Sequence, residues 1–280
     1  MSTNKKKYLF VFDLDETLLT TNKRIPIATI NFLRTLKFHG HKIILASGRP
    51  VRAMIKYYLA LHLTTPLIGH NGGLVYHPLN KKFPTFLCTF KNEDIFGILK
   101  DIRCSGKGDY SNAIFETVKK VYMEKNKFYE DKYLHIKNSK IVFGDLENIL
   151  PKEGPCSFLI DMKSNDYDKD EIKSIIKKYP HLFPRFWGAP FDTFIEINYD
   201  NQSKAEAIKY VLNQMPELKK YTLVCFGDSD NDFSMLDLAG EYGYLMKNSG
   251  LKSGTNYKIT EDINNNNGVM KTIKKLLENN

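Results

Sequence analysis

The 280-residue chain has few cysteines and no long apolar run, and both absences narrow its possible functions. Its four cysteines lie far apart and form no C-x-x-C pair, which argues against a zinc site or a redox dithiol. No stretch approaches the roughly eighteen uncharged apolar residues that a membrane span needs. The first apolar run ends at Asp13, too early for the core of a signal peptide. We therefore expect a cytoplasmic protein with no membrane partner.

Two nucleotide-binding signatures are also missing. The chain has no G-x-x-x-x-G-K-[ST] loop and no G-x-G-x-x-G after a predicted strand, which weakens the case for a nucleoside triphosphatase or a dinucleotide enzyme. The formal net charge is +9, but the lysines that dominate it are scattered along the chain. A nucleic-acid groove usually interleaves arginine with aromatic residues, and no such module is present. We expect no nucleic-acid partner.

Buried apolar runs alternate with helical patterns at both ends of the chain. The predicted strands are residues 8–12, 42–46, 67–69 and 221–226, and the predicted helices are 26–38, 51–61, 204–215, one ending at 238, and 268–277. Such alternation argues for a parallel sheet with helices on both faces. Ligands bind to such sheets beyond the carboxyl ends of the strands, where this sequence places its polar clusters.

The middle of the chain has a different pattern. It contains predicted extended segments at 83–90, 156–162 and 194–197, helices at 93–101 and 169–179, and a loop at 105–109. Alternating strands with one polar face suit an antiparallel sheet that carries helices on its other face. We predict an α/β fold with a doubly wound parallel-sheet core at residues 1–86 and 196–280. An inserted α+β domain occupies residues 87–195, and 264–267 is a polar loop.

Aspartates follow two of the predicted core strands, as Asp13-Leu14-Asp15 and as Asp228 with Asp232. Alone, a D-x-D segment is better explained as a turn or a helix cap. A parallel sheet, however, can bring the two groups together, and converging aspartates need a cation to relieve their repulsion. An all-oxygen set favours Mg²⁺ over zinc. Beside such a metal, one carboxylate can attack phosphorus while its neighbour transfers protons.

Two further side chains could contact a transferring phosphoryl group, whose oxygens require donors. Ser47 offers a hydroxyl at the end of a predicted strand, and Lys204 offers an ammonium group at the start of a helix. Alone, Ser47 is more simply a helix cap and Lys204 a solvated surface lysine. Their functional interpretation therefore depends on the aspartates.

In this order the segments resemble the motifs of the haloacid dehalogenase superfamily, in particular its Cof-type branch (subclass IIB) of metabolite phosphatases. The segments are residues 12–19 (FDLDETLL), 45–49 (LASGR), Lys204, and 226–232 (FGDSDND) with Met235-Leu236. The resemblance spans nearly the whole chain. It implies a Rossmann-like core with a cap of the C2B type inserted after the third strand. It also implies that Asp13 is the nucleophile and that Asp15 is the general acid/base.

The resemblance also implies a ligand set for Mg²⁺ and for the substrate. The metal is expected at the Asp13 carboxylate, the Asp15 backbone carbonyl and Asp228, with Asp232 close by. The predicted phosphate- or substrate-binding residues are Ser47, Gly48, Arg49, Asn71, Arg185, Lys204 and Asn231. An ordinary tight turn explains Asn71 almost as well, and packing within the inserted domain would explain Arg185 and Trp187. His70 and His77 are interpreted as structural.

The resemblance predicts a Mg²⁺-dependent phosphatase that acts on small phosphorylated metabolites such as sugar phosphates. Glu16 and Ala205 stand where this branch commonly has glycine, and these departures leave the substrate open. A phosphohexomutase of the same superfamily and a non-catalytic phosphometabolite-binding protein are the alternatives, although a complete set of site residues argues against the second. We expect a monomer or a weak homodimer.

Overall fold

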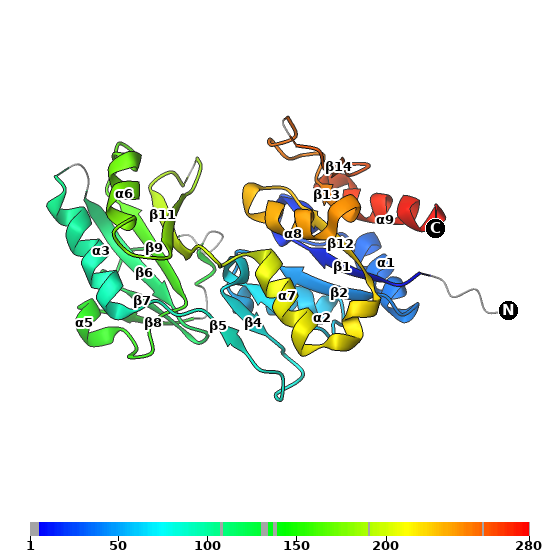
Figure 1. The fold of residues 1–280 in the computed structure, drawn as a ribbon, viewed down its shortest axis with the longest axis horizontal. Helices are drawn as coiled ribbons and strands as arrows, with labels where there is room; N and C mark the ends of the chain where they lie inside the picture. Colours follow the sequence, from blue (N-terminus) through cyan, green and yellow to red (C-terminus); the bar gives the residue numbers. More distant parts are fainter. Residues whose placement is uncertain are drawn as a thin grey trace. The chain divides into compact units, whose positions relative to one another are not determined.

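The computed structural model describes residues 6–106, 109–129, 134–136, 139–189, 191–253 and 255–279 (Figure 1). The chain divides into two compact units, one made of Met1–Phe86 with Ser203–Asn280 and the other of Leu87–Gln202. We call the first the core domain and the second the inserted domain. Each is built on its own sheet.

The sheet of the core domain has the strand order β14-β13-β12-β1-β2-β3-β4-β5. Its strands are β1 (Tyr8–Phe12), β2 (Lys42–Ala46), β3 (Leu67–Gly69), β4 (Leu74–Tyr76), β5 (Phe86–Leu87), β12 (Thr222–Gly227), β13 (Gly243–Leu245) and β14 (Lys258–Ile259). Neighbouring strands from β14 to β3 run parallel, and β4 turns back against β3. Because β1 pairs with β12 in parallel, the residues that follow the two strands emerge at the same edge.

Helices cover both faces of this sheet. They are α1 (Ile27–Phe38), α2 (Val51–Ala60), α7 (Lys204–Gln214), α8 (Phe233–Ala239) and α9 (Gly268–Glu278). Every residue of β1 is buried, and its side chains alternate between two hydrophobic clusters. Phe10 and Phe12 pack with α1, α2 and α9, whereas Leu9 and Val11 pack with α7 and α8. A continuous apolar run is therefore what this doubly covered strand requires.

Short helical turns at the strand ends and between helices carry the polar segments. They are η1 (Leu14–Leu18), η2 (His70–Gly72), η3 (Pro216–Lys220), η4 (Asp230–Asp232), η5 (Gly240–Tyr242) and η6 (Asn264–Asn266). Two of them, η1 and η4, follow the adjacent strands β1 and β12. This arrangement sets the position of the candidate site.

The inserted domain contains a sheet of order β10-β11-β9-β6-β7-β8. Its elements are α3 (Asn92–Cys104), β6 (Tyr110–Glu116), β7 (Lys120–Met123), β8 (Lys140–Phe143), α5 (Leu146–Ile149), β9 (Ser157–Met162), α6 (Lys169–Ile176), β10 (Leu182–Phe186) and β11 (Phe194–Tyr199). Neighbouring strands are antiparallel except β7 and β8, which are parallel. Helices α3 and α6 pack on one face of the sheet through a shared apolar cluster.

The predicted fold class is confirmed, but the second predicted boundary differs from the observed division. Residues 194–199 form the single strand β11, which pairs with β9 and β10, so the inserted domain continues to Gln202. The sequence pattern also missed β4, β6, β7, β8, β10, β13 and β14. The predicted loop at 105–109 includes residues 107 and 108, which lie outside the described residues.

In the part of the chain that the structure describes, no helix is long and apolar enough to cross a membrane.

A buried histidine in the core domain predicts a pH dependence of stability. The His41 Nδ1 atom accepts a hydrogen bond from the Tyr8 N–H at 3.0 Å. Burial lowers the pKa of His41 to about 4, and the nearby Lys7 and His39 act in the same direction. An unfolded histidine titrates near pH 6.5, so below that pH the unfolded chain binds a proton that the folded protein does not.

We therefore expect the stability advantage of the wild type over His41→Gln to hold above pH 6.5. As the pH falls from 6.5 towards 4, this advantage should shrink. Urea denaturation of both proteins at several pH values measures it. A difference in unfolding free energy that stays constant over this range would contradict the prediction.

Candidate active site

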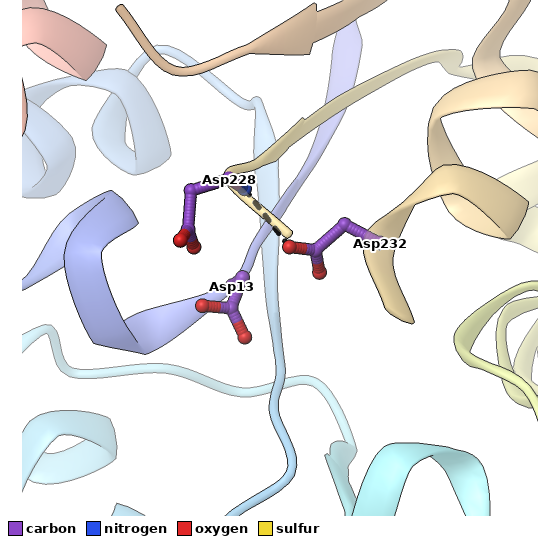
Figure 2. A group of neighbouring side chains, drawn as sticks. All are labelled: Asp13, Asp228 and Asp232. Atoms are coloured by element: carbon purple, nitrogen blue, oxygen red, sulfur yellow. Dashed lines mark hydrogen bonds between the residues drawn. The ribbon is translucent and has the colours of Figure 1, made fainter. Parts of the chain in front are cut away.

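Three aspartates meet at the carboxyl ends of β1 and β12. Asp13 directly follows β1, and its N–H donates to the Phe226 carbonyl of β12 at 3.0 Å. Asp228 directly follows β12, and Asp232 is the last residue of η4. One carboxylate oxygen from each of Asp13, Asp228 and Asp232 lies within 4.8 Å of the others. Figure 2 shows the three side chains around one space.

A fully buried lysine joins two of these aspartates. The Lys204 Nζ atom lies 2.6 Å from Asp13 Oδ1 and 2.5 Å from Asp232 Oδ1, and its side chain has 0% exposure. Burial alone would lower the pKa of Lys204. The Asp13 and Asp232 carboxylates have the larger effect, so the pKa of Lys204 is raised above its usual value. The alternative of a solvated surface lysine is therefore wrong. Lys204 is the first residue of α7, whose N-cap is Ser203.

The second oxygen of Asp232 is also occupied. Asp232 Oδ2 accepts hydrogen bonds from the N–H groups of Asp228, at 2.9 Å, and Ser229, at 3.1 Å. Gly227 makes room for this arrangement, because a Cβ atom there would lie only 2.3 Å from the Asp232 Cβ. The side chain of Asp232 thus connects the loop after β12 to Lys204.

Asp15 points its carboxylate at two cations. Arg49 donates from Nε and Nη2 to the two oxygens of Asp15, both at 2.6 Å, and Lys23 Nζ lies 2.8 Å from Asp15 Oδ1. Burial alone would raise the pKa of Asp15, but Arg49 and then Lys23 hold the pKa well below its usual range. Lys23 is not among the predicted site residues, because nothing in the local sequence distinguishes a lysine in a polar loop from the other lysines.

The loop after β2 is tied to the turn η2. The Ser47 carbonyl accepts from the Asn71 N–H at 3.1 Å, and the Ser47 hydroxyl accepts from the Arg49 N–H at 3.2 Å. Asn71 Oδ1 in turn accepts from Asn231 Nδ2 at 2.8 Å. A Cβ atom on Gly48 would lie 3.1 Å from the same oxygen. Ser47, Gly48, Arg49, Asn71 and Asn231 are thus brought together.

Turn η2 also contacts the start of α7. Gly72 has φ +104°, and a Cβ atom there would lie 2.2 Å from the Ser203 carbonyl oxygen, so only glycine fits. Ser47 does not cap the following helix, because the N-cap of α2 is Pro50 and no side chain caps it. The turn therefore connects the Ser47 loop with the residue that precedes Lys204.

Arg185 and Trp187 lie in the inserted domain. Arg185 is on β10, with Nη1 3.6 Å from Glu196 Oε2, and the Trp187 Nε1 atom donates to the same oxygen at 3.4 Å. The Trp187 ring packs against Phe194. Of the two histidines interpreted as structural, His77 accepts hydrogen bonds from two following N–H groups at Nδ1, and His70 is buried in η2.

The charge of the aspartate cluster fits a divalent cation. Burial raises the pKa of Asp228 to about 7, and the Asp232 carboxylate acts in the same direction. The hydrogen bond that Thr17 Oγ1 donates to Asp228 at 3.0 Å opposes this increase. Burial also raises the pKa of Asp13 well above its usual value. The three carboxylates face one ammonium group, so negative charge is in excess. A hard cation relieves that excess, and the all-oxygen donors suit Mg²⁺.

Known proteins resemble this chain in sequence and in fold. A model of the haloacid dehalogenase-like hydrolases matches residues 10–273. The 5-amino-6-(5-phospho-D-ribitylamino)uracil phosphatase YitU of Bacillus subtilis is 31% identical over 245 residues, which cover 84% of this chain and 85% of that protein. The putative phosphatase MG265 of Mycoplasma genitalium is 27% identical over 278 residues, which cover 95% of this chain and 97% of that protein. The solved structure of the phosphatase BT1666 from Bacteroides thetaiotaomicron aligns with a TM-score of 0.75 at 19% identity, with coverage of 98% and 97%.

The chain belongs to the haloacid dehalogenase-like hydrolase family. Within this superfamily it is a Cof-type phosphatase, which confirms the class predicted from the sequence motifs.

The close contact at Gly227 yields a prediction about stability. Gly227→Ala should push Asp232 away from Lys204, because the added methyl group has no room beside the Asp232 side chain. We expect a loss of about 1–3 kcal/mol in the free energy of unfolding, as in other overpacked sites. Urea denaturation measures this loss.

Gly250→Ala is the matched control, because a Cβ atom at Gly250 meets nothing within 4 Å. Its stability should stay within about 0.5 kcal/mol of the wild type. Equal stability of the two variants would show that the space beside Asp232 is not limiting.

Proposed function

We propose that the protein is a Mg²⁺-dependent phosphatase that hydrolyses small phosphate monoesters, such as sugar phosphates, through an aspartyl-phosphate at Asp13. The observation that carries this proposal is the cluster of Asp13, Asp228 and Asp232 at one sheet edge, with Lys204 between two of them. Three converging carboxylates with one ammonium group between two of them repel one another, and a bound cation relieves that repulsion.

Asp13 is the proposed nucleophile. Lys204 holds Asp13 Oδ1, which fixes the orientation of the carboxylate while the other oxygen approaches phosphorus. The Asp13 oxygen forms a bond to phosphorus as the bond from phosphorus to the ester oxygen breaks. Water then attacks the same phosphorus, which releases inorganic phosphate and restores the carboxylate.

Asp15 is the proposed acid and base. It gives its proton to the departing ester oxygen and takes a proton from the attacking water. Arg49 and Lys23 stabilise its ionised form, so Asp15 must separate from at least one of them to act as an acid. A guanidinium group forms paired hydrogen bonds with a phosphate dianion just as it does with a carboxylate. We propose that the substrate draws Arg49 away from Asp15.

The proposed metal ligands are the carboxylates of Asp13 and Asp228 and the backbone carbonyl of Asp15. Both oxygens of Asp232 already accept hydrogen bonds, so we assign it the role of holding Lys204 and the loop after β12. When bound, Mg²⁺ would neutralise the excess negative charge and polarise the phosphoryl oxygens. Thr17 orients Asp228 through its hydroxyl group.

Ser47, Gly48, Asn71 and Asn231 are the proposed contacts for the phosphate group. Their mutual hydrogen bonds and close contacts arrange a polar loop next to the aspartates. The relative from Bacillus subtilis is named for a substrate with a phosphorylated ribityl group, which supports a phosphorylated sugar or polyol. Arg185 is the proposed contact for a polar part of the substrate.

The nucleophile assignment predicts that Asp13→Ala abolishes Mg²⁺-dependent phosphate release from an aryl phosphate. We expect a loss on the order of 10³-fold or more, because no other side chain takes over the covalent step. Phosphate release and the far-UV circular dichroism spectrum are measured together. A folded variant with wild-type turnover would refute the assignment.

In the wild type, isomerisation of a hexose phosphate primed by a bisphosphate, with no phosphate release, would instead indicate a mutase.

The acid/base assignment predicts a different result for Asp15→Asn. The amide cannot supply or accept the proton, but the backbone carbonyl of residue 15 remains. We expect at least about a 100-fold loss in kcat, with Mg²⁺ affinity close to that of the wild type. Single-turnover kinetics and calorimetric Mg²⁺ titration test the two parts. Near-normal turnover would count against the role of Asp15.

A further inference from the structure

The turn after β1 has an unusual residue at its strained position. Asp15 has φ −69° and ψ 135°, and Glu16 has φ 52° and ψ 8°. These values are close to those of the two central residues of a type II turn, whose second position is usually glycine or asparagine. A glutamate in this left-handed conformation is strained.

Types I and II differ by a flip of the central peptide, which here joins Asp15 to Glu16. A glutamate is comfortable in the type I turn, where its φ is negative. The flip would turn the Asp15 carbonyl to the opposite side. Some other interaction must therefore keep the turn in its observed form.

Three contacts hold Glu16 in place. Asn248 Nδ2 donates to the Glu16 carbonyl at 2.8 Å, Asn264 Nδ2 donates to Glu16 Oε2 at 3.1 Å, and Lys23 Nζ lies 3.2 Å from Glu16 Oε1. The backbone and both carboxylate oxygens are thus bound from outside the turn. These contacts hold the side chain of Glu16 and the carbonyl that follows it in place.

Asn264 is the centre of this arrangement. Its side chain is buried, and Nδ2 also donates to the Leu19 carbonyl at 2.9 Å. Its N–H donates to Asn248 Oδ1 at 3.0 Å, so the two asparagines support each other. The segment predicted as a polar loop therefore contacts both Glu16 and the end of η1.

We propose that Glu16, Asn248 and Asn264 form a positioning clamp that keeps residues 15 and 16 in the observed turn, and with it the Asp15 carbonyl on one side, and thereby sets the affinity for Mg²⁺. The inference rests on the proposed function, because it takes the Asp15 carbonyl as a metal ligand. The clamp residues are not among the proposed ligands of the metal or the proposed contacts of the substrate. They act through the conformation of residues 15 and 16.

Asn264→Ala tests the clamp from outside the turn. We expect Mg²⁺ to bind about five-fold more weakly, the value of roughly one hydrogen bond. Calorimetric titration with MgCl₂ measures the affinity, and thermal unfolding without metal checks the fold. KM for an aryl phosphate at saturating Mg²⁺ should be unchanged, because the Ser47 loop is not affected.

Asn265→Ala is the matched control. Asn265 accepts a hydrogen bond from the Thr21 N–H at 3.0 Å and donates to the Thr21 hydroxyl at 2.9 Å. It thus anchors the same two segments without reaching Glu16. Its Mg²⁺ affinity should equal that of the wild type. An equal loss in Asn265→Ala and Asn264→Ala would overturn the clamp, because general loosening would explain both.

Two substitutions of Glu16 test the clamp independently of Asn264. Glu16→Ala and Glu16→Gly both remove the carboxylate, but only glycine adopts φ 52° without strain. We expect Glu16→Ala to bind Mg²⁺ at least about five-fold more weakly, and Glu16→Gly to bind it nearly as the wild type does. Equal affinities in these two variants would overturn the proposal.

The wild-type titration distinguishes a failure of the clamp from a failure of the proposed metal site. Wild-type Mg²⁺ binding with unchanged affinity in Asn264→Ala would overturn the clamp and leave the proposed function in place. Absence of Mg²⁺ binding by the wild type would overturn the proposed metal site, and the clamp with it. The predicted pattern is weak binding in Asn264→Ala and Glu16→Ala alone.

Discussion

The ion pairs of the buried Lys204 with Asp13 and Asp232 are the interaction on which the rest of the site depends. An unpaired charge at this depth would be strongly destabilising, so the lysine requires both carboxylates to be close. Those carboxylates come from the ends of β1 and η4, and the lysine comes from the start of α7. The pair therefore forms only when β1 and β12 are neighbours and α7 packs against them. The fold of the core domain and the geometry of the site therefore depend on each other.

Glycines set how closely the loops of the site approach one another. Gly227 lets Asp232 fold back onto the loop after β12, and Gly72 lets η2 pack against Ser203. In both places a methyl group would fall within 2.3 Å of another atom. The side chains that make hydrogen bonds across these loops, such as Asn71 and Asn231, follow from that approach. These two close approaches set the spacing of the loops that carry the side chains of the site.

Much of the core could be predicted from the sequence because its strands are covered on both faces. β1 is apolar throughout, and β2 and β12 are apolar after their first residue. The chemistry-bearing residues Asp13, Ser47 and Asp228 follow these strands directly. The strands of the inserted domain are less regular. In β6 a register shift between Tyr110 and Asn112 breaks the alternation, and the buried Asn112 is satisfied by the backbone of Lys125. Such compensation depends on partners far along the chain, which a local pattern does not contain.

The same limit explains why sequence analysis could note Glu16 but could not interpret it. A turn that directs a carbonyl to one side can be stabilised by glycine, which lowers the strain, or by contacts that outweigh the strain. This chain uses contacts, and two of the three come from residues 248 and 264, more than two hundred positions away. The first of these residues follows β13 and the second precedes α9. Packing of the C-terminal segment onto the sheet therefore contributes directly to the conformation of the turn that carries Asp15.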